Sequence, residues 1–148
     1  MSDFLAKLPE FLGNHLALAA LFVILLVGLV VVQAKLLFSK IKPLSPAALT
    51  QLINRDSPLL IDLSAIADFE KMHVPGARHV LMSQFDPEHK DIAKARELPV
   101  VLIDKDGRGN AQKAAPRLVK AGFPRVYTLD GGVLAWHQAQ LPVAKGAK

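Results

Sequence analysis

The feature that most constrains this chain is a long run without charge near its N-terminus. No Asp, Glu, Lys or Arg occurs in residues 11–34, and Leu16–Val32 holds only apolar residues and one glycine. A helix needs about 20 mainly apolar residues to cross the hydrocarbon core of a bilayer. The run therefore predicts one N-terminal transmembrane helix over residues 11–38, after a short polar leader over residues 1–10.

An apolar run can also belong to a signal peptide or to a buried core helix, and this sequence fits both poorly. A cleaved signal peptide has a basic N-terminus and a small-residue cleavage site, whereas here Asp3 and Glu10 offset Lys7. Lys35 and bulky apolar residues follow the run, which is a poor cleavage context. A helix buried in a soluble core usually keeps a polar face, and this run has none. We expect an uncleaved anchor that places the lipid bilayer among the partners of the chain.

Basic residues on one side of the anchor predict its orientation. Lys35, Lys40 and Lys42 follow the run closely, and lysine and arginine favour the cytoplasmic side of a membrane. We expect a single-pass protein with its N-terminus outside and its C-terminal domain in the cytoplasm.

Overall composition excludes several functions. The net charge is +5, but its basic residues are scattered and do not alternate with aromatic residues, so nucleic-acid binding is not expected. The chain has no cysteine. It therefore forms no disulfide and no zinc–thiolate site, and it has no cysteine nucleophile.

The remaining sequence predicts one α/β domain over residues 44–148, after a basic linker over residues 39–43. Ser45 and Pro46 have the residue types of a helix cap and first helical position. Helical patterns alternate with short apolar strands, which are expected at residues 59–63, 78–80, 99–103 and 126–129. Short apolar strands between helices indicate a parallel sheet covered on both faces.

The loop after residues 99–103 is the candidate functional site. Ligands of parallel sheets bind at the carboxyl ends of strands, and the backbone N–H groups of a loop entering a helix can cradle an anion. Asn110 is expected to cap that helix. The candidate residues are Asp104, Lys105, Asp106, Gly107, Arg108, Gly109 and Asn110.

Two chemistries based on carboxylates compete for this loop. Asp104 and Asp106 resemble the aspartate motif of haloacid-dehalogenase-type phosphatases, which use magnesium, but Arg108 stands where that family has threonine or valine. A calcium loop requires glutamate at its twelfth position, and Ala115 occupies that position. We expect no metal or other cofactor.

The stretch from Leu59 to Val143 resembles the rhodanese-like family in the order and spacing of its short motifs. These motifs are Leu60-Ile61-Asp62-Leu63, His73-Val74-Pro75-Gly76-Ala77, Pro99 to Ile103, Lys120-Ala121-Gly122-Phe123, Leu129-Asp130-Gly131-Gly132 with Trp136, and Leu141-Pro142-Val143. The resemblance implies an α/β fold with a five-stranded parallel sheet flanked by helices. It extends to small bacterial members with a membrane anchor, which implies the inner membrane.

The same resemblance implies that the chemical residues have been lost. Asp104 stands at the position of the cysteine that carries the persulfide in active members. Gly109 and Ser64 stand where arginine is common, and Asn110 where serine is common. We expect a catalytically inactive protein that acts as a binding or scaffolding module for an integral membrane protein. The alternative is an enzyme, either a sulfurtransferase that uses an external thiol or an Asp104-dependent hydrolase.

Structural roles are expected for several polar residues. Asp62 is expected to end its strand by accepting loop N–H groups, and His73 to form a hydrogen bond within its turn. Asp104 can fill the amide cradle with its own oxygens. Lys105, Arg108, Lys113 and Arg117 form either a basic mouth or, as we favour, a solvated face.

Overall fold

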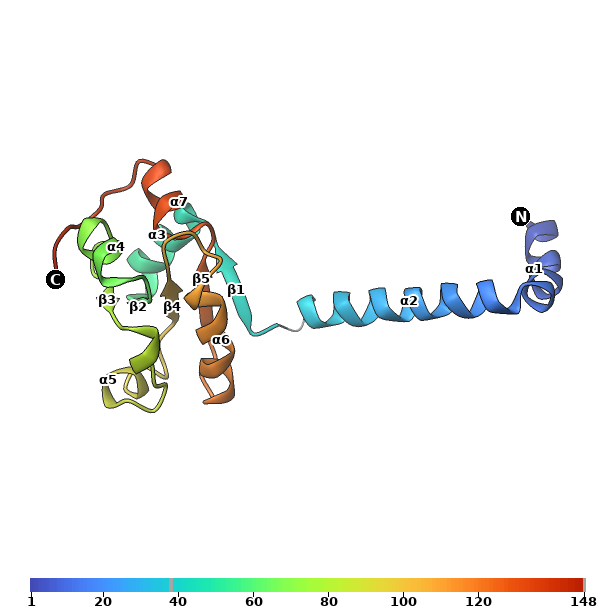
Figure 1. Ribbon diagram of the computed structural model, residues 1–148, viewed down its shortest axis with the longest axis horizontal. Coiled ribbons are helices and arrows are strands. Elements are labelled where there is room, and N and C mark those ends of the chain that lie inside the picture. The colour runs from blue at the N-terminus through green and yellow to red at the C-terminus, as the bar shows by residue number, and fades with distance from the viewer. Residues whose placement is uncertain (38, 148) are drawn as a thin grey trace. The chain divides into compact units, whose positions relative to one another are not determined.

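The computed structural model describes residues 1–37 and 39–147, which form two compact units (Figure 1). The first unit spans Met1–Ser39 and the second spans Lys40–Lys148. The predicted end of the transmembrane helix at residue 38 and the predicted end of the domain at residue 148 lie outside the described residues.

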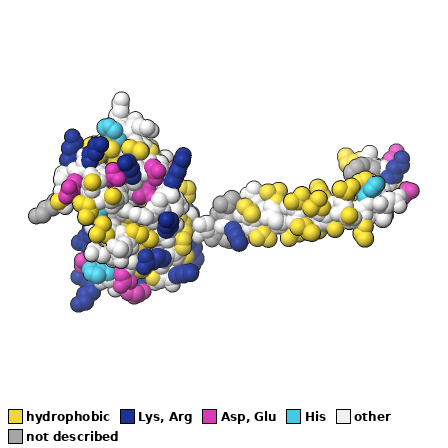
Figure 2. Space-filling view, in the orientation of Figure 1, with side chains coloured by type: hydrophobic (Ala, Val, Ile, Leu, Met, Phe, Trp, Pro, Cys, Tyr) yellow, Lys and Arg dark blue, Asp and Glu magenta, His cyan; other side chains and the backbone are white. Residues whose placement is uncertain are grey.

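The first unit contains two helices, α1 (Ser2–Asn14) and α2 (Leu16–Leu37). The prediction of a polar leader followed by one helix from residue 11 differs from this arrangement, because α1 includes the leader and ends within the uncharged run. His15 separates the helices with a non-helical backbone, φ −129° and ψ 49°. Within α2, the 20 residues Leu16–Lys35 are long and apolar enough to cross a membrane. Figure 2 shows hydrophobic side chains exposed along α2.

The second unit is built on a five-stranded parallel sheet, as the resemblance implies. Its strands lie in the order β1-β5-β4-β2-β3. The strands are β1 (Ile41–Leu44), β2 (Leu59–Asp62), β3 (Arg78–His79), β4 (Val100–Ile103) and β5 (Val126–Leu129). The central strand β4 is buried throughout, which agrees with its uninterrupted apolar sequence.

Strand β1 corrects the prediction that residues 39–43 form a linker. Its residues pair in parallel with β5, from Ile41 opposite Val126 to Leu44 opposite Leu129. Pro43 cannot donate a ladder hydrogen bond, but β1 is an edge strand, where proline is tolerated. The folded domain therefore includes residues that the sequence pattern assigned to a connection.

Helices cover both faces of the sheet. They are α3 (Pro46–Asp56), α4 (Ile66–Lys71), α5 (Lys90–Ala93), α6 (Asn110–Lys120) and α7 (Gly132–Gln138), together with the 3₁₀ turn η1 (Met82–Gln84). Ser45 caps α3 as predicted, since its Oγ accepts from the N–H of Ala48 at 3.2 Å. Within residues 87–96, only the four residues of α5 are α-helical.

Alternate side chains of β4 support two separate apolar cores. Val100 and Leu102 pack with α5 and α6 on one face of the sheet. Val101 and Ile103 pack with α3, α4 and α7 on the other face. Because successive side chains of a strand point to opposite faces, this single strand holds both layers in place. It also fixes the position of the loop that follows Ile103.

Candidate functional site

The candidate loop connects the carboxyl end of β4 to the first turn of α6, as the sequence predicts. Asp104 begins the loop and is 4% exposed. Its Oδ1 accepts from the N–H of Gly107 at 2.6 Å, and its Oδ2 accepts from Gly109 at 3.0 Å and Ala111 at 3.1 Å. The expected amide cradle exists, and the carboxylate of Asp104 occupies it.

Asn110 does not cap α6, so that prediction is wrong. Its Nδ2 donates instead to the carbonyl oxygen of Leu63, at 2.8 Å, and so joins the loop to the end of β2. The capping residue of α6 is Gly109, which has no side chain to contribute. Asp104, five residues before Gly109, takes the role of the capping side chain, because its Oδ2 accepts the N–H groups of Gly109 and Ala111 at the start of the helix. A negative charge there is also favoured by the helix dipole.

The first turn of α7 supports the loop from the other side, which the sequence pattern did not reveal. The N–H of Val133 donates to the carbonyl oxygen of Asp104 at 2.9 Å, and that of Leu134 donates to Lys105 at 3.0 Å. Gly107 and Gly132 have φ angles of +77° and +62°, and a Cβ on either would lie against backbone atoms of the other segment. The pair of glycines after β5 was visible in the sequence, but only as part of a family motif.

The basic side chains around the loop do not converge on it. Lys105 pairs with Asp68 on α4 at 3.0 Å, and Arg117 donates to the carbonyl oxygen of Phe85 at 2.8 Å while its guanidinium lies over that ring. Asp106 accepts from the N–H of Arg108 at 3.0 Å. These contacts agree with the favoured prediction of a solvated face.

The end of β2 contains a second buried carboxylate. Asp62 is fully buried, and its Oδ1 accepts from the N–H of Ser64 at 2.8 Å, as predicted. Its Oδ2 has no hydrogen-bond partner among the described residues. Burial raises the pKa of this carboxyl above its ordinary value, and the hydrogen bonds from Ser64 only partly oppose that effect.

His73 has the structural role that the sequence predicts. Its Nδ1 donates to the carbonyl oxygen of Phe69 at 2.8 Å, and its ring stacks on the Phe69 ring with centroids 3.8 Å apart. The imidazole is 1% exposed. It therefore fixes the turn after α4 and cannot reach a solvent-borne substrate.

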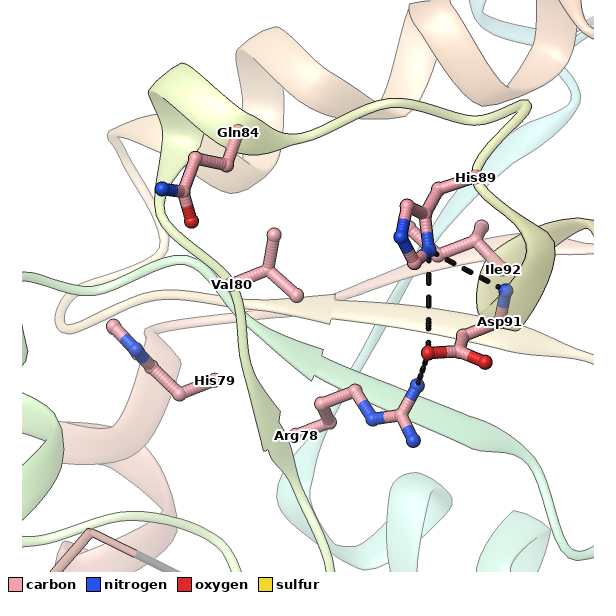
Figure 3. Close-up of a pocket in the computed structure, with 7 residues that line it drawn as sticks. All are labelled: Arg78, His79, Val80, Gln84, His89, Asp91 and Ile92. Carbon is pink, nitrogen blue, oxygen red and sulfur yellow. Dashed lines mark hydrogen bonds and ion pairs between the residues drawn. The ribbon is translucent and has the colours of Figure 1, made fainter.

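The sequence did not predict a pocket of about 540 Å³ beside the edge strand β3 (Figure 3). Its lining includes Arg78, His79, His89 and Asp91. Asp91 lies 3.3 Å from Arg78 and 4.0 Å from His89, as the dashed lines in Figure 3 mark, so its carboxylate partly neutralises the charge of the Arg78 guanidinium. Residues from the candidate loop do not line this pocket.

The structure describes the carboxylate and imidazole side chains of residues 1–37 and 39–147 that could bind a metal ion. No group of three or more His, Asp or Glu side chains within these residues is arranged to hold a metal ion. Asp104 and Asp106 instead direct carboxylate oxygens to N–H groups of their own loop.

Comparison with known sequences reveals relatives of two kinds. The uncharacterized protein YibN of Escherichia coli K12 is 33% identical over 141 residues, which cover 95% of this chain and 98% of YibN. The thiosulfate sulfurtransferase GlpE of Vibrio cholerae is 36% identical over 84 residues, which cover 57% of this chain and 76% of GlpE. Similarity to YibN thus extends over the N-terminal helices, whereas similarity to GlpE covers a shorter stretch.

Solved structures share the fold of the second unit. A thiosulfate sulfurtransferase from Pseudomonas aeruginosa superposes with a TM-score of 0.64 and 28% identity, over 72% of this chain and 20% of that chain. A rhodanese-related protein from Thermoplasma volcanium gives a TM-score of 0.58 with 16% identity, over 70% of this chain and 97% of that chain. The model of the rhodanese-like domain family matches residues 45–139. The chain, which lacks the cysteine of sulfurtransferases, therefore belongs to the rhodanese-like domain family.

Proposed function

We propose that this protein is a membrane-anchored rhodanese-like module that binds an integral membrane protein and does not catalyse sulfur transfer. The observation that carries the proposal is the state of the amide cradle. Three backbone N–H groups that would hold a bound anion already donate to the carboxylate of Asp104. The carboxylate of Asp104 thus accepts the hydrogen bonds of the loop itself and holds the loop in one conformation.

Sulfur transfer would need both a sulfur nucleophile and a place for its anionic donor. The chain has no cysteine, and a carboxylate forms no persulfide. Asp104 also holds negative charge at the centre of the cradle, where it repels an incoming anion. These two effects act together against thiosulfate.

The alternative of an Asp104-dependent hydrolase receives no support from the loop geometry. A nucleophilic carboxylate has to present an oxygen to its substrate. Here the two oxygens of Asp104 together accept three N–H groups, and the residue is 4% exposed. Release of Asp104 would leave those donors without partners.

We expect the purified full-length protein in detergent to transfer sulfur from thiosulfate or mercaptopyruvate no faster than the buffer alone. Thiocyanate or hydrogen sulfide production measures this rate, and Vibrio cholerae GlpE is the positive control. The Asp104→Cys variant should gain little, because Gly109 supplies no guanidinium to hold an anionic donor. A robust rate from the natural chain would refute the inactive module, and a large gain from the single substitution would refute the role of Gly109.

The anchor is proposed to be α2, oriented with the rhodanese-like domain in the cytoplasm of a bacterial cell. Its support is the length and apolarity of Leu16–Lys35, together with Lys35, Lys40 and Lys42 on the domain side. We expect external protease to leave the domain intact in spheroplasts and to digest it after lysis. A periplasmic protein serves as the control for access. Digestion of the domain without lysis would reverse the orientation.

Partner binding is tested by crosslinking the full-length protein in native membranes. We expect discrete heteromeric products, because anchoring concentrates the domain near other membrane proteins. They should diminish when Leu16–Val32 is replaced by an unrelated apolar helix, or when Lys105 and Arg108 are changed to Glu. Lys94→Glu is the matched control, since Lys94 is a cation outside the loop. Monomer or self-association alone, under several crosslinking chemistries, would remove the support for a scaffolding role.

A further inference from the structure

Helix α1 is amphipathic, with apolar and charged side chains on opposite faces. With 3.6 residues per turn, Leu5, Leu8 and Leu12 fall on one face, and the charged residues Asp3, Lys7 and Glu10 fall on the opposite face. Leu5 is 63% exposed and Leu12 is 42% exposed. Leu8 is half-buried, so the described part of this apolar face is covered only in part within its own unit.

The non-helical backbone at His15 lets α1 point in a different direction from α2, the proposed anchor. Figure 1 shows α1 turning away from the axis of α2. Between the two helices lies an apolar groove of about 690 Å³, whose walls include Leu8, Phe11 and Leu12 from α1 and Leu18 and Phe22 from α2. Because the α2 wall is part of the predicted membrane span, the groove continues from a lipid-facing surface.

We propose that α1 is an interfacial helix: its apolar face and the groove are covered by lipid acyl chains of the leaflet at which α2 enters the membrane. The inference rests on the proposed anchoring by α2 and adds a second, in-plane contact with the bilayer. Amphipathic helices of this kind bury an apolar face at the headgroup boundary and keep their charges in water.

Two features set the depth and the lipid preference of α1. Pro9 has no N–H, so the carbonyl of Leu5 loses its usual helical partner, which headgroups and water can replace but hydrocarbon cannot. Asp3 and Glu10 outnumber Lys7, so the side chains of α1 have no net positive charge with which to attract anionic lipids. The helix therefore lies at the interface of zwitterionic membranes, held by its apolar face.

Single-cysteine labelling tests this directly, because the natural chain has no cysteine. Full-length variants Leu8→Cys, Leu12→Cys, Asp3→Cys and Glu10→Cys carry an environment-sensitive fluorophore in phosphatidylcholine proteoliposomes. We expect headgroup-proximal spin-labelled lipid to quench the two leucine positions about threefold more than the two acidic positions, and aqueous iodide to show the reverse order. The pattern should be the same in vesicles that contain phosphatidylglycerol and in high salt.

Each different outcome overturns the interfacial helix. Equal iodide quenching at all four positions means that α1 lies in water. Protection of Leu8→Cys and Leu12→Cys from both quenchers means that protein, such as a second copy of the chain, covers the face. Strong quenching of all four by deep lipid labels means that α1 is inserted. Leu25→Cys in α2 is the control for anchoring, since loss of its deep quenching would refute the anchor itself and not the role of α1.

Discussion

Replacing Asp104 with alanine is expected to lower the free energy of unfolding of the rhodanese-like domain by about 3 kcal/mol. The change removes the acceptor of the N–H groups of Gly107, Gly109 and Ala111, in a loop where Asp104 itself is 4% exposed. Buried donors left without partners are costly, and hydrogen bonds to a charged acceptor are stronger than neutral ones. Asp104→Asn should lose less, because its amide oxygen can still accept from the start of α6.

Denaturant unfolding of the full-length protein in detergent measures this effect through Trp136. It is the only tryptophan, it is buried in the domain, and its Nε1 donates to the carbonyl oxygen of Pro142 at 2.7 Å. The matched control is Asp106→Ala, which removes an exposed carboxylate that accepts from Arg108. It should change stability by less than about 0.5 kcal/mol. Equal effects of the two substitutions would show that Asp104 has no special role in the cradle.

Gly132→Ala is expected to be at least as damaging, with a loss on the order of 3–5 kcal/mol. A Cβ at this position would overlap the carbonyl oxygen of Asp104 and lie 2.6 Å from the backbone nitrogen of Asp106, at a φ of +62°. Backbone atoms cannot move aside as the end of a flexible side chain can. The loop and the first turn of α7 would have to separate, which would break the hydrogen bonds that Val133 and Leu134 donate.

Gly122→Ala is the control that distinguishes the steric overlap at Gly132 from the cost of placing alanine at a positive φ. Gly122 has a φ of +90°, but a Cβ there would meet nothing within 4 Å. Its substitution should cost only the conformational term, about 1–2 kcal/mol. Trp136 fluorescence in full-length protein again reports the unfolding transition. If Gly132→Ala were no more destabilising than Gly122→Ala, the contact between the loop and α7 would not be tight in solution.

Together these substitutions test what holds the loop after β4 in its shape. The carboxylate holds the loop from within, and α7 holds it from outside. Both contacts leave the side chains of Lys105 and Arg108 on a fixed backbone, as the proposed binding surface would require. Crosslinking Asp104→Ala and Gly132→Ala in native membranes relates the stability of the loop to partner binding. If no partner binds the loop, these variants should give the same heteromeric products as the natural chain.

The sequence by itself determined those features that depend on local pattern. Uninterrupted apolar residues identified β4, and the Ser45-Pro46 pair located the start of α3. The missing cysteine is likewise a property of composition, and it excludes persulfide chemistry on this chain. The order of short motifs supplied the family, and thus the five-stranded parallel sheet.

Tertiary structure decided those features that depend on partners distant in the chain. Residues 41–44 contain Lys42 and Pro43 and show no strand pattern, but β5 offers them a sheet edge, and hydrogen bonding to it makes them β1. Asn110 has a residue type that commonly caps helices, yet its side chain donates to the carbonyl oxygen of Leu63. The carboxylate of Asp104 accepts the N–H group of Ala111 at the start of α6 instead. Local sequence ranks the conformations of a segment, whereas hydrogen bonds and contacts made by the folded chain select among them.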